Sequence, residues 1–290
     1  MSIYIKCGPV VFQLRDFYDK SPFTTWHWKL DQFKTNSISD NITQITLKKT
    51  EFDISEAHTV NHEKDGFYTR EVLKTDKGTV WRLIRNSTSE VVLSFYADDS
   101  DNKISLMEDN TETDGKVAFE YLSRLAIYSM IDSSVLSFHG VLMEYNGKGI
   151  IISAPSEMGK TTHARLWRDE KNALIINGDN SCCFKENGVW KGFGIPWSGT
   201  SGEQINRKVR IVAAVVLERA EENKAYPINE YDAFCNLQSL VHYPSWDIKR
   251  SEQAIDLFNE FLNDIPVFKL ECRPDVDAVE TLFKALEELL

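Results

Sequence analysis

Residues 149–167 read GIIISAPSEMGKTTHARLW, and this stretch decides how the second half of the chain folds. The apolar, β-branched run over 149–153 predicts a buried strand. A turn of small residues comes next, then Gly159-Lys160-Thr161-Thr162, and the residues after these are typical of a helix. A strand that leads through such a turn into a helix is the arrangement that binds the phosphates of a nucleotide.

The spacing matches the Walker A pattern G-x-x-x-x-G-K-[ST] except at its first position, where Ala154 replaces glycine. In such a loop the backbone N–H groups form a cradle for phosphate oxygens, the lysine reaches the β- and γ-phosphates, and the hydroxyl binds Mg²⁺. Alanine serves at this position if its φ stays below zero. The residues predicted to bind the nucleotide are Ala154, Pro155, Ser156, Glu157, Met158, Gly159, Lys160, Thr161 and Thr162.

Composition and charge limit the classes of partner. The chain has 290 residues, of which 42% are hydrophobic and 27% charged, as in ordinary folded domains. A net charge of −11 argues against a nucleic-acid partner, because an acidic surface repels polyanions. The five cysteines form no C-x-x-C pair, and no signal peptide or membrane-length apolar run is found. We therefore expect a cytoplasmic protein with no membrane association.

The first 115 residues alternate short apolar stretches with polar turns, which predicts a small β-rich N-terminal domain over 1–115. Residues 98–116 are polar and acidic and are interpreted as a linker or exposed turn. The second domain, 116–290, is expected to begin with a helix over 116–134. Its predicted strands cover 140–145, 149–154, 173–178, 182–193, 208–220 and 265–272, and its predicted C-terminal helices lie within 228–243, 246–264 and 274–290.

The residues around the loop resemble a kinase family. FHGVLMEYNGKGIIISAPSEMGKTTHARLW (138–167), followed by ALIINGDN (173–180), resembles the catalytic domain of HPr kinase/phosphorylase, and GFGIPWSGTSGE (192–203) is similar to the bacterial HPr-kinase-like serine kinases. The resemblance covers about residues 138–220. It implies the fold shared with ATP-dependent phosphoenolpyruvate (PEP) carboxykinases. We therefore expect an α/β (α+β) chain in which an HPr kinase/PEP carboxykinase-like P-loop domain follows the β-rich domain.

The resemblance also implies roles for individual residues. His139 matches a histidine that lies near the reacting phosphoryl group and assists proton movement. Asp179 would orient the attacking hydroxyl as a base, bind the metal, or both, and Lys160 would complete the catalytic set. The metal ligands implied are Thr161, Asp179 and Glu203. Gly178-Asp179-Asn180 stands where the family has two acids, so phosphorylase activity is not predicted.

Structural interpretations compete with these roles. A histidine between apolar neighbours is usually buried and hydrogen-bonded to the backbone, and Gly-Asp-Asn is typical of a turn after a strand. The place of Asp179 at the end of a strand favours a site, because α/β proteins bind ligands there.

The function expected is transfer of the γ-phosphoryl group of Mg²⁺-ATP to a hydroxyl, with serine of a protein or peptide as the family's usual acceptor. Ala154, Glu157 and the single acid at Asp179 motivate an alternative, a nucleotide-binding module without catalysis. A carboxykinase acting on a small organic acid is less favoured, because its arginine and metal-ligand motifs are not found. Family enzymes are often hexameric, so a homo-oligomer stays an open alternative.

Overall fold

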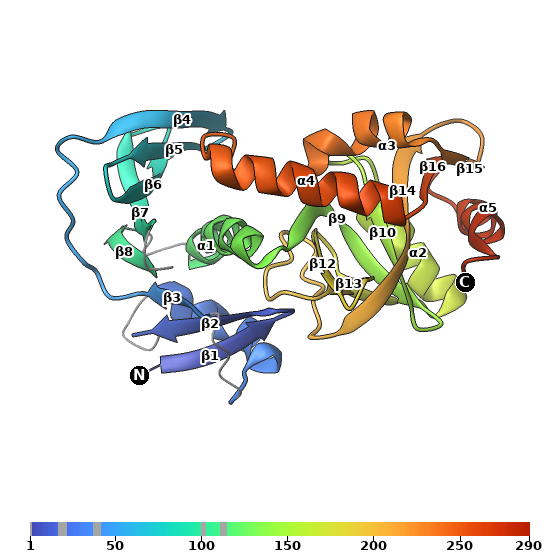
Figure 1. Cartoon of the computed structure of the whole chain (residues 1–290), viewed down its shortest axis with the longest axis horizontal. Coiled ribbons are helices and arrows are strands. Elements are labelled where there is room, and N and C mark those ends of the chain that lie inside the picture. Colours follow the sequence, from blue (N-terminus) through green and yellow to red (C-terminus); the bar gives the residue numbers. More distant parts are fainter. Residues whose placement is uncertain (1, 17–21, 37–41, 100–102, 111–114) are drawn as a thin grey trace. The chain divides into compact units, whose positions relative to one another are not determined.

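The structure, a computed structural model, describes residues 2–16, 22–36, 42–99, 103–110 and 115–290. The chain is mixed α/β and divides into two compact units, Met1–Ser129 and Met130–Leu290. Each unit contains one large sheet, and Figure 1 labels most of the strands and the α-helices of both.

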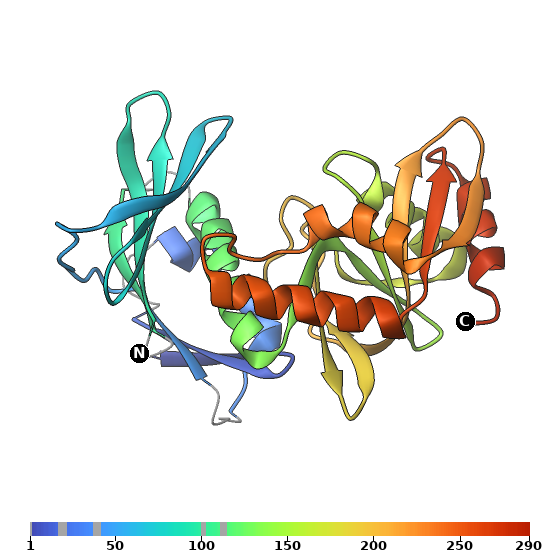
Figure 2. The ribbon, with the colours of Figure 1, turned by 45° about the horizontal axis from the view of Figure 1, so that its top comes forward.

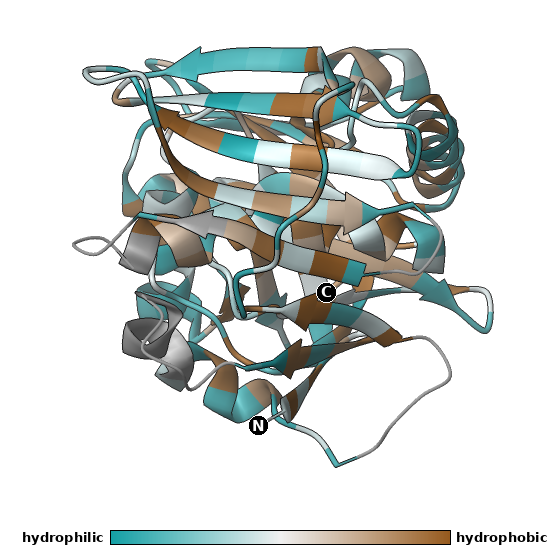
Figure 3. Ribbon diagram, turned by 90° about the vertical axis from the view of Figure 1, so that its left-hand side faces the viewer, coloured by the Kyte–Doolittle hydropathy of each residue, from teal (hydrophilic) through white to brown (hydrophobic). Residues whose placement is uncertain are grey.

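The first unit is a mostly antiparallel sheet in the order β1-β2-β3-β8-β7-β6-β5-β4, with parallel pairing only where β3 contacts β2 and β8. The edge strand β4 is hydrophilic along nearly its whole length (Figure 3), which suits a strand with one unpaired side. The strands of this unit are β1 (Ser2–Cys7), β2 (Val10–Arg15), β3 (Ile42–Thr46), β4 (His58–Asp65), β5 (Tyr68–Lys74), β6 (Gly78–Arg85), β7 (Glu90–Asp98) and β8 (Lys103–Asp109). Its helices are η1 (Pro22–Phe33) and α1 (Gly115–Met130).

One expectation for this unit needs correction. The predicted linker contains strand β8, which pairs with β3 and β7 because Ile104 and Leu106 are buried in the sheet. The rest of that stretch includes 100–102 and 111–114, which lie outside the described residues. The compact units divide after Ser129, whereas the sequence suggests a domain boundary at 115/116.

The position of helix α1 explains the later boundary. The Tyr121 hydroxyl donates a hydrogen bond to the Arg82 carbonyl on β6 (3.0 Å), and Glu120 pairs with the buried Lys29 (3.2 Å). These partners belong to the first unit. The periodicity of the sequence indicates the helix, but it does not indicate the sheet on which the helix packs.

The second unit contains the stretch 149–167. Its strands are β9 (Leu136–Tyr145), β10 (Lys148–Ser153), β11 (Leu174–Asn177), β12 (Asn180–Glu186), β13 (Val189–Phe193), β14 (Lys208–Arg219), β15 (Lys224–Ile228) and β16 (Val267–Cys272). Its helices are η2 (Ile131–Ser133), α2 (Lys160–Lys171), α3 (Glu230–Leu237), η3 (Gln238–Leu240), α4 (Ile248–Asp264) and α5 (Val276–Leu286). The strands predicted here are confirmed; the short strand β15 is one that the sequence pattern does not predict.

Hydrogen bonding joins β10, β9, β12, β13 and β14 into a closed ring, because β14 pairs with both β13 and β10. The predicted hairpin before the loop is confirmed: Tyr145 lies opposite Lys148, and Asn146 and Gly147 have φ of 49° and 75°. Strands β10, β14 and β16 run parallel, so their carboxyl ends lie at one edge of the sheet. The loop after β10 begins at this edge.

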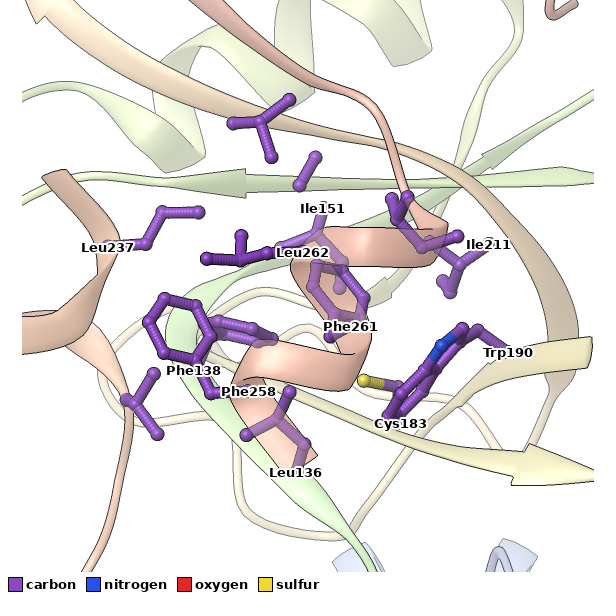
Figure 4. Close-up of a cluster of buried hydrophobic side chains, with 14 of the residues drawn as sticks. Leu136, Phe138, Ile151, Cys183, Trp190, Ile211, Leu237, Phe258, Phe261 and Leu262 are labelled. Atoms are coloured by element: carbon purple, nitrogen blue, oxygen red, sulfur yellow. The ribbon is translucent and has the colours of Figure 1, made fainter. Parts of the chain in front are cut away.

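Two buried clusters hold the helices against the strands. Helices α3 and α4 pack on one cluster (Figure 2), in which Phe138 of β9 contacts Phe258 and Phe261 of α4 at ring distances of 5.9 and 5.2 Å. Figure 4 shows Phe261 between the Phe138 ring and Trp190 of β13, whose ring is 5.2 Å from that of Phe261. Helices α2 and α5 pack on the second cluster, which includes the fully buried Trp167. Within the described ranges, no helix has the length and apolarity needed to span a bilayer.

Candidate functional site

The loop over residues 154–159 joins strand β10 to helix α2. Ala154 is buried and is not among the described residues with positive φ, so it meets the condition for replacing glycine. Positive φ occurs at Glu157 (65°) and at Gly159 (108°), which immediately precedes the helix. Glu157 is exposed, and its carbonyl accepts a hydrogen bond from Arg219 at the end of β14. The loop thus turns its one acidic residue to the surface.

The backbone donors of this loop suit an anion. No described residue accepts a hydrogen bond from the N–H groups of residues 156–162, and the start of α2 has no side-chain cap. The first N–H groups of a helix have no partner inside the helix, and the helix dipole places partial positive charge there. These donors are therefore available to phosphate oxygens at the point where α2 begins.

The Lys160 ammonium group lies inside the loop. Its Nζ donates hydrogen bonds to the carbonyl oxygens of Ala154 (2.7 Å) and Pro155 (3.0 Å), and it is 3.1 Å from Nε2 of His139. The residue is only 6% exposed. Burial lowers the pKa of Lys160, and the nearby Asp179 carboxylate opposes that shift. The cation is thus held where the loop, His139 and Asp179 meet.

Strand register brings the predicted catalytic residues together. Strand β9 lies between β10 and β12, with His139 opposite Asn180 on β12 and Gly140 opposite Ser153 on β10. His139 therefore stands between the start of the loop and the turn before β12. Its Nδ1 is 3.7 Å from Oδ1 of Asp179, and both side chains are about one third exposed, at 27% and 31%. Ser156 Oγ lies 3.4 Å from the other ring nitrogen.

The turn that carries Asp179 is fixed from two sides. Oδ1 of the fully buried Asn177 accepts hydrogen bonds from the N–H groups of Asp179 (3.0 Å) and Asn180 (2.8 Å). The Asp179 carbonyl accepts one from the N–H of Gly140 (2.9 Å). Gly199, at φ 54°, passes so close that a Cβ there would meet the Asp179 carboxylate at 2.5 Å.

The three predicted metal ligands do not all face one point. Thr161 Oγ1 lies 3.5 Å from the Gly178 carbonyl, on the side of the loop nearest Asp179. The Glu203 carboxylate instead pairs with Arg165 (3.1 Å) and Arg168 (2.9 Å) on α2. No cluster of three His, Cys, Asp or Glu side chains suited to a metal occurs in the described part of the chain.

Magnesium does not need such a cluster. It is usually bound through one or two carboxylates together with substrate phosphates and water. Thr161 and Asp179 fit that pattern beside a bound nucleotide. Both carboxylate oxygens of Glu203 accept hydrogen bonds from arginines in this conformation. The role of Glu203 as a third metal ligand stays a prediction.

Sequence reasoning missed several residues around the site. The sequence does indicate a role for Asn177, because an asparagine side chain commonly accepts a hydrogen bond from the backbone N–H two residues further along the chain. Nothing in the sequence indicates that His242 lies near the site. Its ring lies 6.2 Å from that of His139 because the segment after η3 pairs with β9, a contact between distant parts of the chain. The arginines that hold Glu203 give no signal in the sequence beyond the exposed face of a helix.

A buried histidine lies in the first turn of helix α2, four residues before Trp167. His163 is 2% exposed, and its Nε2 accepts a hydrogen bond from Nε1 of Trp167 (3.1 Å), so the ring is the neutral form protonated on Nδ1. Burial lowers the pKa of His163 to about 4, from an ordinary value near 6.5. Protonating the ring would place an unpaired charge in the core and remove the acceptor for Trp167.

This histidine predicts a loss of stability in acid. Between pH 6.5 and about 4 the unfolded chain binds the proton and the folded chain does not, so the free energy of unfolding falls as pH falls. The loss from this group should be about 2.5 kcal/mol by pH 4.5. Denaturant unfolding at pH 7 and 4.5 measures it. The difference between the two pH values should be smaller for His163→Gln than for wild type. The exposed His62→Gln is the control, and an equal pH dependence in all three proteins would contradict the assignment.

No protein-family model matches the chain, and a search of curated proteins finds no match. Among solved structures, the chain is similar to the Hpr(Ser) kinase/phosphatase from Coxiella burnetii, with a TM-score of 0.31 and 9% sequence identity. That similarity covers 52% of this chain and 88% of the other. A likeness at this level does not establish a shared fold, so a function for the chain has to be inferred from the geometry of its site.

Proposed function

We propose that this chain is an ATP-dependent phosphotransferase that moves the γ-phosphoryl group of Mg²⁺-ATP to a hydroxyl. The observation that carries the proposal is the meeting of Lys160, His139 and Asp179 at the start of a helix whose loop N–H groups have no acceptor among the described residues. A cation, a row of donors and an adjacent carboxylate are the parts that phosphoryl transfer needs, because catalysis there depends on positioning and charge neutralisation.

Each residue has a distinct role in this proposal. The N–H groups of 156–162 and the Lys160 ammonium group bind the phosphate oxygens. When ATP binds, Lys160 exchanges the carbonyl oxygens of Ala154 and Pro155 for phosphate oxygens. Thr161 and Asp179 would hold Mg²⁺, which would supply positive charge to neutralise the phosphates. Asp179, held against Gly199, orients the acceptor hydroxyl.

These groups account for the bond that forms, the bond that breaks and the proton that moves in the transfer step. A bond forms between the hydroxyl oxygen and the γ-phosphorus, and the bond from that phosphorus to the oxygen of ADP breaks. The hydroxyl proton passes to Asp179, with His139 placed 3.7 Å away to relay it to solvent. The acceptor class implied by the resemblance to HPr-kinase-like proteins is serine of a protein or peptide. Action in the cytoplasm is part of the same proposal, and a homo-oligomer stays an open alternative.

A second candidate is a nucleotide-binding module without turnover. It is favoured by the single acid at Asp179 and by Lys160, which already has two carbonyl partners within the loop. Both candidates require nucleotide binding and differ only in the transfer step.

One pair of measurements separates the candidates. Calorimetric titration of the full chain with a non-hydrolysable ATP analogue and Mg²⁺ should show binding at one site per chain. Incubation with γ-labelled ATP, Mg²⁺ and a panel of serine-containing peptides and proteins should then move label to an acceptor or, more slowly, to water. Binding with no transfer to any acceptor or to water would support the module. Absence of binding would contradict both candidates.

A further inference from the structure

The Asn177 side chain uses all of its hydrogen-bonding groups inside the protein. Its Oδ1 accepts from the N–H groups of Asp179 and Asn180, and its Nδ2 donates to the carbonyl oxygens of Ile195 (3.1 Å) and Trp197 (3.0 Å). The residue is fully buried at the end of β11. One side chain therefore joins the turn that carries Asp179 to the segment that continues into Gly199.

Only asparagine satisfies these four partners at this position. Aspartate supplies the acceptor oxygens and lacks the two donors, and glutamine is longer by one methylene in a closely packed interior. The two joined segments are also the two that approach the Asp179 carboxylate: its own turn and Gly199 beside it. Among the described residues, the Asn177 side chain forms no hydrogen bond with His139 or with the loop after β10.

We propose that Asn177 is a positioning residue for the transfer reaction, which sets the Asp179 carboxylate against the acceptor hydroxyl. This inference rests on the proposed function. It predicts that loss of the Asn177 side chain lowers the rate of the transfer step and leaves nucleotide affinity unchanged, because Lys160 and the loop N–H groups keep their own partners. A displacement of about 1 Å in a reacting group lowers rate by about 100-fold.

The chain offers a matched control. Asn223 also organises a turn through both ends of its amide, with Nδ2 donating to Asp275 (2.8 Å) and Oδ1 accepting from the N–H of Arg273 (2.8 Å). It is partly buried, and its hydrogen bonds lie outside the site. Asn223→Ala should lower the midpoint of thermal unfolding and leave the transfer rate within about twofold of wild type, since distant sites act independently.

The test compares Asn177→Ala, Asn177→Asp and Asn223→Ala in the full chain. The rate is measured as phosphate release from γ-labelled ATP to water, and affinity as the Kd of a non-hydrolysable ATP analogue with Mg²⁺. We expect Asn177→Ala to lower the rate about 10- to 100-fold with a Kd within about twofold of wild type. Asn177→Asp retains the acceptors for the turn and should lose less rate. If Asn177→Ala does not fold, Asn177→Asp decides the question alone.

Hydrogen exchange of the Asp179 and Asn180 amides provides a readout that does not depend on activity. Both amides should exchange faster in Asn177→Ala and stay at the wild-type rate in Asn223→Ala. Unchanged exchange, an unchanged transfer rate in both Asn177 variants, or a Kd that rises in parallel with the loss of rate would each overturn the inference. If wild type itself binds no nucleotide, the proposed function fails, and the exchange measurement still decides whether Asn177 sets the turn.

Discussion

Replacing Lys160 with alanine should lower the affinity for Mg²⁺-ATP by about 100-fold or more. Lys160 is 6% exposed, and its ammonium group lies inside the loop, 3.1 Å from Nε2 of His139. Removing a charge-assisted contact to phosphate costs about 3 kcal/mol, and each 1.4 kcal/mol corresponds to about tenfold in Kd. Calorimetric titration with a non-hydrolysable analogue measures the change.

Lys171 is the matched control for this substitution. It lies on the same helix, at the end away from the loop, and pairs with Glu280 (2.5 Å). Lys171→Ala removes one positive charge from α2 and should leave the Kd within about twofold of wild type, because its effect is local. Equal Kd values for Lys160→Ala and wild type would contradict the assignment of 154–162 as a phosphate site. Equal losses in the two variants would mean that only net charge matters.

Replacing Asp179 with asparagine should lower the rate of phosphoryl transfer about 1,000-fold, within the range of about 10²–10⁴ for loss of a general base. The substitution keeps the size of the side chain beside Gly199 and removes the charge that faces His139. Nucleotide affinity should fall much less than the rate, because the loop and Lys160 are unchanged. Single-turnover measurement with labelled ATP separates the transfer step from binding.

The control for charge removal is Asp264→Asn. Asp264 accepts a hydrogen bond from Trp190 (2.8 Å) and pairs with Lys185, at the other end of β12 from Asp179. Its replacement should reduce stability and leave transfer intact. A transfer rate for Asp179→Asn within a few-fold of the wild-type rate would show that the Asp179 carboxylate is not the general base. If wild type binds nucleotide and transfers nothing, the Asp179 variant has no rate to lose and the module is favoured.

Much of the site is predictable from the sequence because it depends on local pattern and strand order. The run over 149–153 and the turn Asn146-Gly147 predict two antiparallel strands, and both are present as β9 and β10. Once β9 also pairs with β12, register alone brings His139 beside Asp179. The condition on Ala154 concerns its φ, and the backbone meets it.

The rest depends on contacts that pattern does not encode. The resemblance places Glu203 at a metal, but its carboxylate pairs with Arg165 and Arg168, which tertiary packing brings within reach. Lys103, Ile104, Ser105 and Leu106 alternate as in a strand, but this short pattern lies within a polar, acidic stretch, so the sequence predicts a linker there. The periodicity of helix α1 indicates that the helix packs on a sheet, but it does not indicate which one. The sequence assigns the helix to the second domain, whereas its hydrogen bond to β6 joins it to the first unit.

The central claim is that the loop before α2 binds a polyphosphate through its N–H groups and Lys160. A crystal structure of the full chain with a non-hydrolysable ATP analogue and Mg²⁺ tests it most directly. The account predicts phosphate oxygens within hydrogen-bond distance of the N–H groups of 156–162, with Nζ of Lys160 moved from the carbonyl oxygens of Ala154 and Pro155 onto a phosphate. An analogue bound elsewhere, with Lys160 still on those carbonyl oxygens, would contradict it.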